Sequence, residues 1–93
     1  MRLFLAAVMA SVADPAMAWN ICDDLWFTRN AIYDRAGYCF NSDLGRAVFD
    51  NAGCTPGEVR LTGQAARDVT TIQQYEQELS CDVDTARKRL DIP

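Results

Sequence analysis

The sequence predicts a small all-α domain of three helices, or three helices and a short fourth, stapled by two disulfides. Three observations support this prediction: apolar residues recur at helical spacing in three segments, four cysteines occur in 93 residues, and the chain opens with an apolar leader. A chain of this length has room for one domain. Because such a domain buries only about 60 % of its unfolded surface, it needs covalent support.

Composition excludes several classes of function. The chain has a formal net charge of −4 and no histidine. An acidic chain is not a polybasic nucleic-acid binder, so we expect no nucleic-acid partner. Without histidine, His-based acid–base catalysis, Ser-His-Asp and Cys-His nucleophile pairs, and mixed cysteine–histidine zinc sites are also excluded.

Residues 1–18 have the pattern of a cleavable signal peptide. Arg2 supplies a positive start, an apolar run follows over 3–13, and Ala16-Met17-Ala18 has the small residues of a cleavage site, although Asp14 is atypical there. A membrane-spanning helix needs roughly 20 apolar residues, and neither this run nor any later one is long enough. We therefore expect a domain of residues 19–93, periplasmic or secreted, with no membrane span.

The first helix is predicted to follow an N-cap at Asp23 or Asp24 and to end at Gly37, where a left-handed residue is favoured. Its apolar residues recur with the period of one helix face. They are Cys22, Leu25, Trp26, Ile32, Tyr33 and Ala36.

Two further helices are predicted. A short second helix is capped by Asn41 or Ser42, buries Leu44, Val48 and Phe49, and ends by 51–53. A third follows an N-cap at Thr62, and its apolar stripe consists of Ala65, Val69, Ile72 and Leu79, with Tyr75 alongside. Residues 84–90 form at most one or two basic turns, in which Arg87, Lys88 and Arg89 make a solvated face rather than an anion site.

Two charged residues fall on apolar faces. Arg29 lies within the stripe of the first helix and Glu76 within that of the third. A single buried charge is costly without a partner, so the simplest interpretation is a bidentate pair between packed helices. The alternatives are that both side chains reach outward to solvent, or that Arg29 binds a ligand carboxylate.

The four cysteines favour disulfides over a metal site. In an oxidising compartment, two disulfides of roughly 2–4 kcal/mol each are the usual outcome for so small a domain. Zinc ligands usually come in pairs two to four residues apart, whereas the spacings here are 17, 15 and 27. We expect no metal and no cofactor. The cysteines are Cys22, Cys39, Cys54 and Cys81.

Residues 25–40, LWFTRNAIYDRAGYCF, resemble the signature of the YARHG domain, a bacterial and presumed extracellular module of unknown function. The resemblance extends to Leu44 and Phe49 in the second helix and to 61–76 in the third. Residues 33–37 read YDRAG, so the histidine of the family name is absent, and any function that uses it is unavailable. Cys54 stands where an aromatic residue is usual, which indicates a disulfide-bearing branch. The motif matches are Arg29, Asn30, Ile32, Tyr33, Arg35, Gly37 and Phe40.

The pairing of the cysteines is left open between two arrangements. An up-down-up order of helices, with the third parallel to the first, joins Cys22 to Cys54 and Cys39 to Cys81. The alternative joins the middle pair and the outer pair. The first arrangement is slightly preferred.

We interpret most of the motif residues as stabilising the fold, and we put forward a binding surface as a hypothesis. Asn30 and Arg35 are not assigned to packing; Asn30 caps or bridges a loop, and Arg35 pairs with Asp50 or covers an aromatic ring. One helix cannot hide Trp26 and Phe27 equally, so these two, with Trp19, are expected to form an exposed aromatic patch. The proposed binding residues are Trp26, Asn30 and Arg35.

The resemblance and the leader together imply a non-enzymatic binding or interaction module of the cell envelope, with peptidoglycan or an envelope protein as partner. A small secreted effector or inhibitor is the alternative. A carboxylate-based hydrolase would need paired acids about 5–9 Å apart in a cleft, for which the domain has little room. The acids available to it are Asp23, Asp24, Asp34, Asp43 and Asp50. The oligomeric state is not predicted.

Overall fold

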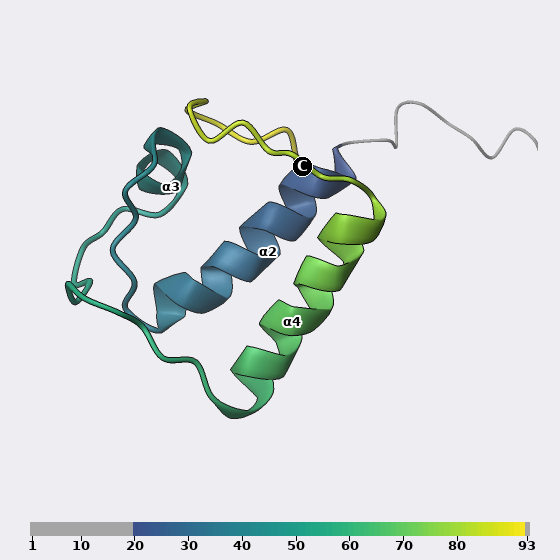
Figure 1. Ribbon diagram of the computed structural model, residues 1–93. Helices are drawn as coiled ribbons and strands as arrows, with labels where there is room; N and C mark the ends of the chain where they lie inside the picture. Colours follow the sequence, from purple (N-terminus) through teal and green to yellow (C-terminus); the bar gives the residue numbers. More distant parts are fainter. Residues whose placement is uncertain (1–19, 93) are drawn as a thin grey trace, which may run out of the picture.

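The computed structural model describes residues 20–92 of the chain (Figure 1). In this part of the chain there are three helices, α2 (Ile21–Arg35), α3 (Asp43–Val48) and α4 (Gly63–Glu78), and no strand. The prediction of a three-helix, all-α fold is confirmed. Helix α2 lies between the other two, and none of the described helices is long and apolar enough to cross a membrane. The predicted signal peptide lies outside the described residues.

The N-cap of helix α2 lies three residues before Asp23, the first of the two predicted caps. The side chain of Asn20 accepts a hydrogen bond from the Asp23 amide at 3.2 Å, which makes Asn20 the N-cap. The carboxylate of Asp23 is thereby free for a different partner. At the other end, Gly37 has a φ of +93° and follows the last turn, as predicted.

The two later helices begin where the sequence predicts. The Ser42 hydroxyl accepts a hydrogen bond from the Gly45 amide at 2.9 Å and caps α3. Thr62 is the N-cap residue of α4, although its side chain makes no capping hydrogen bond. The one or two turns predicted over 84–90 do not amount to a fourth helix: this segment consists of turns and bends.

The predicted direction of α4 is wrong, and so is the slightly preferred pairing of cysteines. Cys22 at the start of α2 bonds to Cys81 after the end of α4, and Cys39 bonds to Cys54. Helices α2 and α4 are therefore antiparallel (Figure 1). The reason is the length of α3. Its six residues span about 9 Å and cannot return the chain along α2, which is about 22 Å long.

The chain instead stays near the C-terminal end of α2 until α4 begins. The Thr55 amide donates to the Gly37 carbonyl at 2.8 Å, beside the Cys39–Cys54 disulfide. The Asn51 side chain accepts from the Phe40 amide at 2.8 Å and donates to the Phe40 carbonyl at 2.9 Å. This pair of hydrogen bonds fixes the loop after α3 to the segment before it.

The core lies between α2 and α3 and is largely aromatic. Phe49 stacks on Phe40 with ring centroids 4.9 Å apart, and on Phe27 at 5.4 Å. Trp26 is 6 % exposed and packs against Phe49 as well. The predicted exposed aromatic patch is therefore wrong for Trp26 and Phe27, because Phe49 contacts both rings. Trp19 lies outside the described residues.

Candidate functional site

Residues 82–92 form a strap that crosses the N-terminal end of α2. The Leu44 amide at the start of α3 donates to the Thr85 carbonyl at 2.9 Å, and the Asn20 amide donates to the Asp91 carbonyl at 3.3 Å. Val83 and Leu90 pack against the aromatic core. The strap thus connects the starts of two helices and covers part of the core between them.

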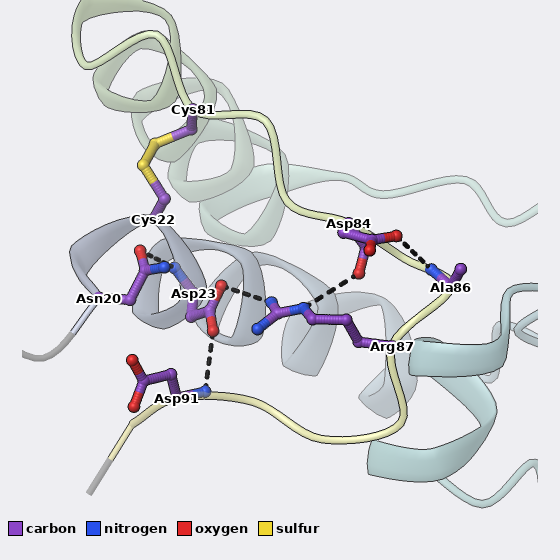
Figure 2. A network of polar contacts seen from close by, with 8 residues as sticks. All are labelled: Asn20, Cys22, Asp23, Cys81, Asp84, Ala86, Arg87 and Asp91. Carbon is purple, nitrogen blue, oxygen red and sulfur yellow. Dashed lines mark hydrogen bonds and ion pairs between the residues drawn. A yellow bond between two sulfur atoms is a disulfide. The ribbon is translucent and has the colours of Figure 1, made fainter.

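One buried carboxylate anchors the strap (Figure 2). Asp23 is 1 % exposed; its Oδ1 accepts from Arg87 Nη2 at 2.7 Å and its Oδ2 accepts from the Asp91 amide at 2.8 Å. Arg87 also donates from Nε to the Asp84 carbonyl at 3.2 Å. The predicted solvated face is therefore wrong for Arg87, which is committed to Asp23, whereas its two basic neighbours are exposed.

The charge state of this anchor follows from its contacts. Burial alone raises the pKa of Asp23, but the hydrogen bonds from Arg87 and from the Asp91 amide, with the charge of Arg87, outweigh burial and lower this pKa below 3.8. The hydrogen bond to Asp23 likewise raises the pKa of Arg87 above its ordinary value. Both groups are charged at neutral pH, so the strap is held by an ion pair.

The ion pair predicted between Arg29 and Glu76 is present. Arg29 Nε donates to Glu76 Oε1 at 2.8 Å, and Nη2 donates to Oε2 at 3.1 Å. The two side chains are 22 % and 13 % exposed. The pair joins α2 to α4 in bidentate geometry, and it occupies the guanidinium that the third interpretation would have left for a ligand.

A groove lies where α2, α4 and the strap meet, and we call it the strap groove. Its volume is about 540 Å³, and it is open to solvent. The Arg29–Glu76 pair and Trp26 line one part of it. Neutral groups that can donate and accept hydrogen bonds line much of the rest, and the carboxylate of Asp82 also lies there. The neutral groups come from Gln73, Gln77, Ser80 and Thr85.

The structure does not bring the predicted binding residues together on a surface. Asn30 is buried, and its side-chain amide donates to the Trp26 carbonyl one turn earlier at 2.9 Å. Arg35 is exposed at the end of α2, beside a second hollow that Ile32 and Leu61 also line. In the described part of the chain Arg35 forms no ion pair with Asp50. Of the three residues, only Arg35 is available at the surface.

The remaining motif residues have structural positions. Ile32 and Phe40 are buried, and Gly37 ends α2. Tyr33 packs edge-on against Tyr38 with ring centroids 5.7 Å apart. These contacts agree with the interpretation that most of the motif stabilises the fold.

The candidate carboxylates are dispersed or already paired. Asp43 lies 3.2 Å from Arg46 and 3.8 Å from Lys88, and Asp50 accepts from the Ala52 amide. Asp23 has a lowered pKa, whereas a glycosidase acid needs a raised one. Among the residues that the structure describes, no cluster of three potential metal ligands occurs.

The Asp23–Arg87 anchor was missed by the sequence analysis. Asp23 is three residues before Trp26 and seven before Asn30, so it lies on the buried face of α2. A charged residue on the apolar face of a helix is the same signal that identified Arg29. It was not recognised for Asp23 because this residue was interpreted as a helix cap. Arg87 gave no signal because its segment has no periodic pattern.

The fold and the two disulfides define a small, disulfide-linked, all-α domain. A family model described as the YARHG domain matches residues 1–77, so the chain belongs to the YARHG domain family. The matched segment includes α2, α3 and most of α4, and it ends before Cys81 and the strap. No curated protein and no solved structure matches the chain.

Proposed function

We propose that this protein is an exported, non-enzymatic binding module of the bacterial cell envelope, and that it binds peptidoglycan in the strap groove. Export is supported by the two disulfides, which form and persist in oxidising compartments, and by the leader at residues 1–18. YARHG domains typically occur in exported bacterial proteins, which is consistent with this location.

The observation that carries the proposal is the lining of the strap groove. Arg29 and Glu76 neutralise each other, which leaves Asp82 as the one charged side chain of the lining without an ion pair in the described residues. Most of the polar groups that a ligand would meet there are neutral, so we expect hydrogen bonding to contribute most of the recognition. Peptidoglycan presents hydroxyl and amide groups, which the side chains of Gln73, Gln77 and Thr85 can pair with. Two rigid features, the Cys22–Cys81 disulfide and the Asp23 anchor, hold the strap side of the groove in place.

A binding role is also supported over catalysis. Two carboxylates line the strap groove: Glu76, which is paired with Arg29, and Asp82. Acid–base hydrolysis of a glycan needs one carboxyl that stays protonated near neutral pH. Both oxygens of Glu76 accept hydrogen bonds from Arg29, so this carboxylate is not free to act on a substrate.

Co-sedimentation with purified peptidoglycan sacculi tests the proposal. The full chain is expressed, recovered from the periplasm in oxidised form and compared with a Gln73→Ala/Gln77→Ala variant. The matched control is Thr71→Ala/Gln74→Ala, which changes two exposed residues on a different face of α4. Each lost hydrogen bond is worth about 1 kcal/mol, so we expect the groove variant to bind about tenfold or more weakly and the control to bind normally.

Two outcomes would overturn this proposal. No retention on sacculi would exclude peptidoglycan and favour an envelope protein as partner. Equal loss in both variants, or in neither, would show that the strap groove is not the binding site. Growth inhibition by the purified protein would instead support a secreted effector.

A further inference from the structure

We propose that the protein forms a twofold-symmetric homodimer through one face of the α2–α4 pair. We call this face the hairpin face. It shares no residue with the lining of the strap groove, and the second copy of the chain is its occupant. The inference is independent of what the strap groove binds.

The hairpin face consists of two parallel rows of residues. In each helix the row has spacings of four, three and four residues, which keeps all its members on one helix face. The row on α2 is Ile21, Leu25, Thr28 and Ile32. The row on α4 is Asp68, Ile72, Tyr75 and Leu79, whose last residue is the C-cap.

The two rows lie on the same side of the helix pair. Ile32 and Asp68, one from each row, line the same hollow. The strap groove is lined by a different set, which includes Arg29 on α2 and Gln77 on α4. The helices are side by side and antiparallel (Figure 1). Rows on the same side of both helices therefore run next to each other along the pair.

This face carries the large apolar side chains that are most exposed in the described part of the chain. Ile21 is 51 % exposed, and Tyr75 and Leu79 are each 53 % exposed. All three belong to the two rows. Exposed apolar side chains that cluster on one face, rather than scatter singly, are typical of an interaction surface.

The charges along α2 indicate which partner fits. Asp24 near the start and Arg35 at the end are eleven residues apart, which is close to three full turns, so they share one flank of the helix beside the apolar row. Neither forms an ion pair with another described residue. A second α2 that runs antiparallel to the first would place Asp24 of each copy opposite Arg35 of the other. Such self-complementarity is what a twofold interface requires.

The position of the symmetry axis follows from the Arg29–Glu76 pair. Arg29 is close to the midpoint between Asp24 and Arg35, and its partner Glu76 is therefore at the same level on α4. Tyr75, the neighbour of Glu76, is also at this level. A twofold axis through the midpoint of α2 brings Tyr75 of the two copies together, with Leu79 of each copy directed toward the Ile72 region of the other.

Sedimentation equilibrium of the exported, oxidised protein tests this inference over a range of concentrations. We expect the mass of two chains, with a Tyr75→Lys variant raising the dissociation constant at least tenfold. The matched control is Gln74→Lys, which adds the same charge to the neighbouring position, on a different face of α4. Because both positions are exposed, circular dichroism should show that both variants remain folded.

Charge reversal tests the antiparallel arrangement. Asp24→Arg and Arg35→Asp, made singly, should each weaken the dimer about tenfold, because each creates two like-charge contacts across the axis. The double variant should restore dimerisation. The mass of one chain at every concentration would overturn the proposal, and so would a dimer that Tyr75→Lys leaves intact or that the double charge reversal fails to restore.

Discussion

At the scale of single residues, Asp23 determines whether the strap stays attached. Its carboxylate accepts from the Arg87 side chain and from the Asp91 amide while almost fully buried. An Asp23→Asn variant keeps the size of the side chain but removes the charge and one acceptor oxygen. We predict that it lowers the free energy of unfolding by about 2–3 kcal/mol, as measured by urea denaturation at neutral pH.

The control for this prediction is a residue of the same helix that lies outside the hairpin face. Asp34→Asn makes the same chemical change at an exposed carboxylate that forms no ion pair in the described residues. We expect a change within about 0.5 kcal/mol there. Equal losses in the two variants would contradict the role assigned to Asp23.

The same carboxylate gives the protein an acid-sensitive component of stability. The pKa of Asp23 is lower in the folded state than its ordinary value of 3.8, so its stabilising contribution is fully present above that value. The contribution is lost as the pH falls through the folded-state pKa. Between about pH 5 and about pH 2, the wild-type protein should therefore lose more stability than Asp23→Asn does. If the free energies of unfolding of the two proteins fall in parallel as the pH is lowered, this prediction is contradicted.

At this scale, the sequence revealed the charges whose surroundings were periodic. Arg29 and Glu76 stood out because each interrupts an apolar stripe, and the structure contains their pair. The pairing of Asp23 with Arg87 could not be found in the same way, because Arg87 lies in a segment without regular structure. The Asn51 contacts with Phe40 depend on the shape of two loops, which no local pattern specifies.

At the scale of elements, α3 depends on a glycine in its interior. A Cβ at Gly45 would lie 2.8 Å from the Phe40 Cβ and 2.9 Å from its ring. Helix propensity alone favours alanine over glycine by about 1 kcal/mol. We predict the opposite sign for Gly45→Ala, a loss of about 1–3 kcal/mol, because Phe40 is buried in the aromatic stack and has little freedom to move.

Thermal unfolding measures this effect, and Ala47→Gly is the matched control. Ala47 is exposed in the same helix, so its replacement reports helix propensity without a packing change and should cost about 1 kcal/mol. A higher Tm for Gly45→Ala would show that Phe40 accommodates the methyl group.

The positions of the three helices were predictable, but the direction of α4 was not. Periodicity and capping residues located all three, and Ser42, Thr62 and Gly37 mark boundaries as expected. The second helix is predicted to be short, with Phe49 as the last residue of its buried stripe and an end by 51–53. In the structure Phe49 is the C-cap, with extended backbone, and places its ring in the core. That early end prevents α3 from returning the chain along α2.

At the scale of the whole molecule, the two ends of the fold are held together by contacts between segments that are distant in sequence. The Cys22–Cys81 disulfide and the Asp23 anchor both connect the start of α2 to the region after α4. This region lies beyond the residues that the YARHG family model matches. The fold class and the family could be predicted from local patterns. The strap could not, because its contacts depend on the antiparallel course of α4.

The pairing of the four cysteines tests this arrangement most directly. Arginine residues place each cysteine in a different tryptic peptide: one that ends at Arg29, and those of residues 36–46, 47–60 and 68–87. Digestion of the oxidised protein without reduction, followed by mass spectrometry, therefore identifies the pairs. We predict that 68–87 is linked to the peptide that ends at Arg29, and 36–46 to 47–60. A link between the peptide that ends at Arg29 and 47–60 would contradict the antiparallel packing of α2 and α4, and with it the strap groove and the hairpin face.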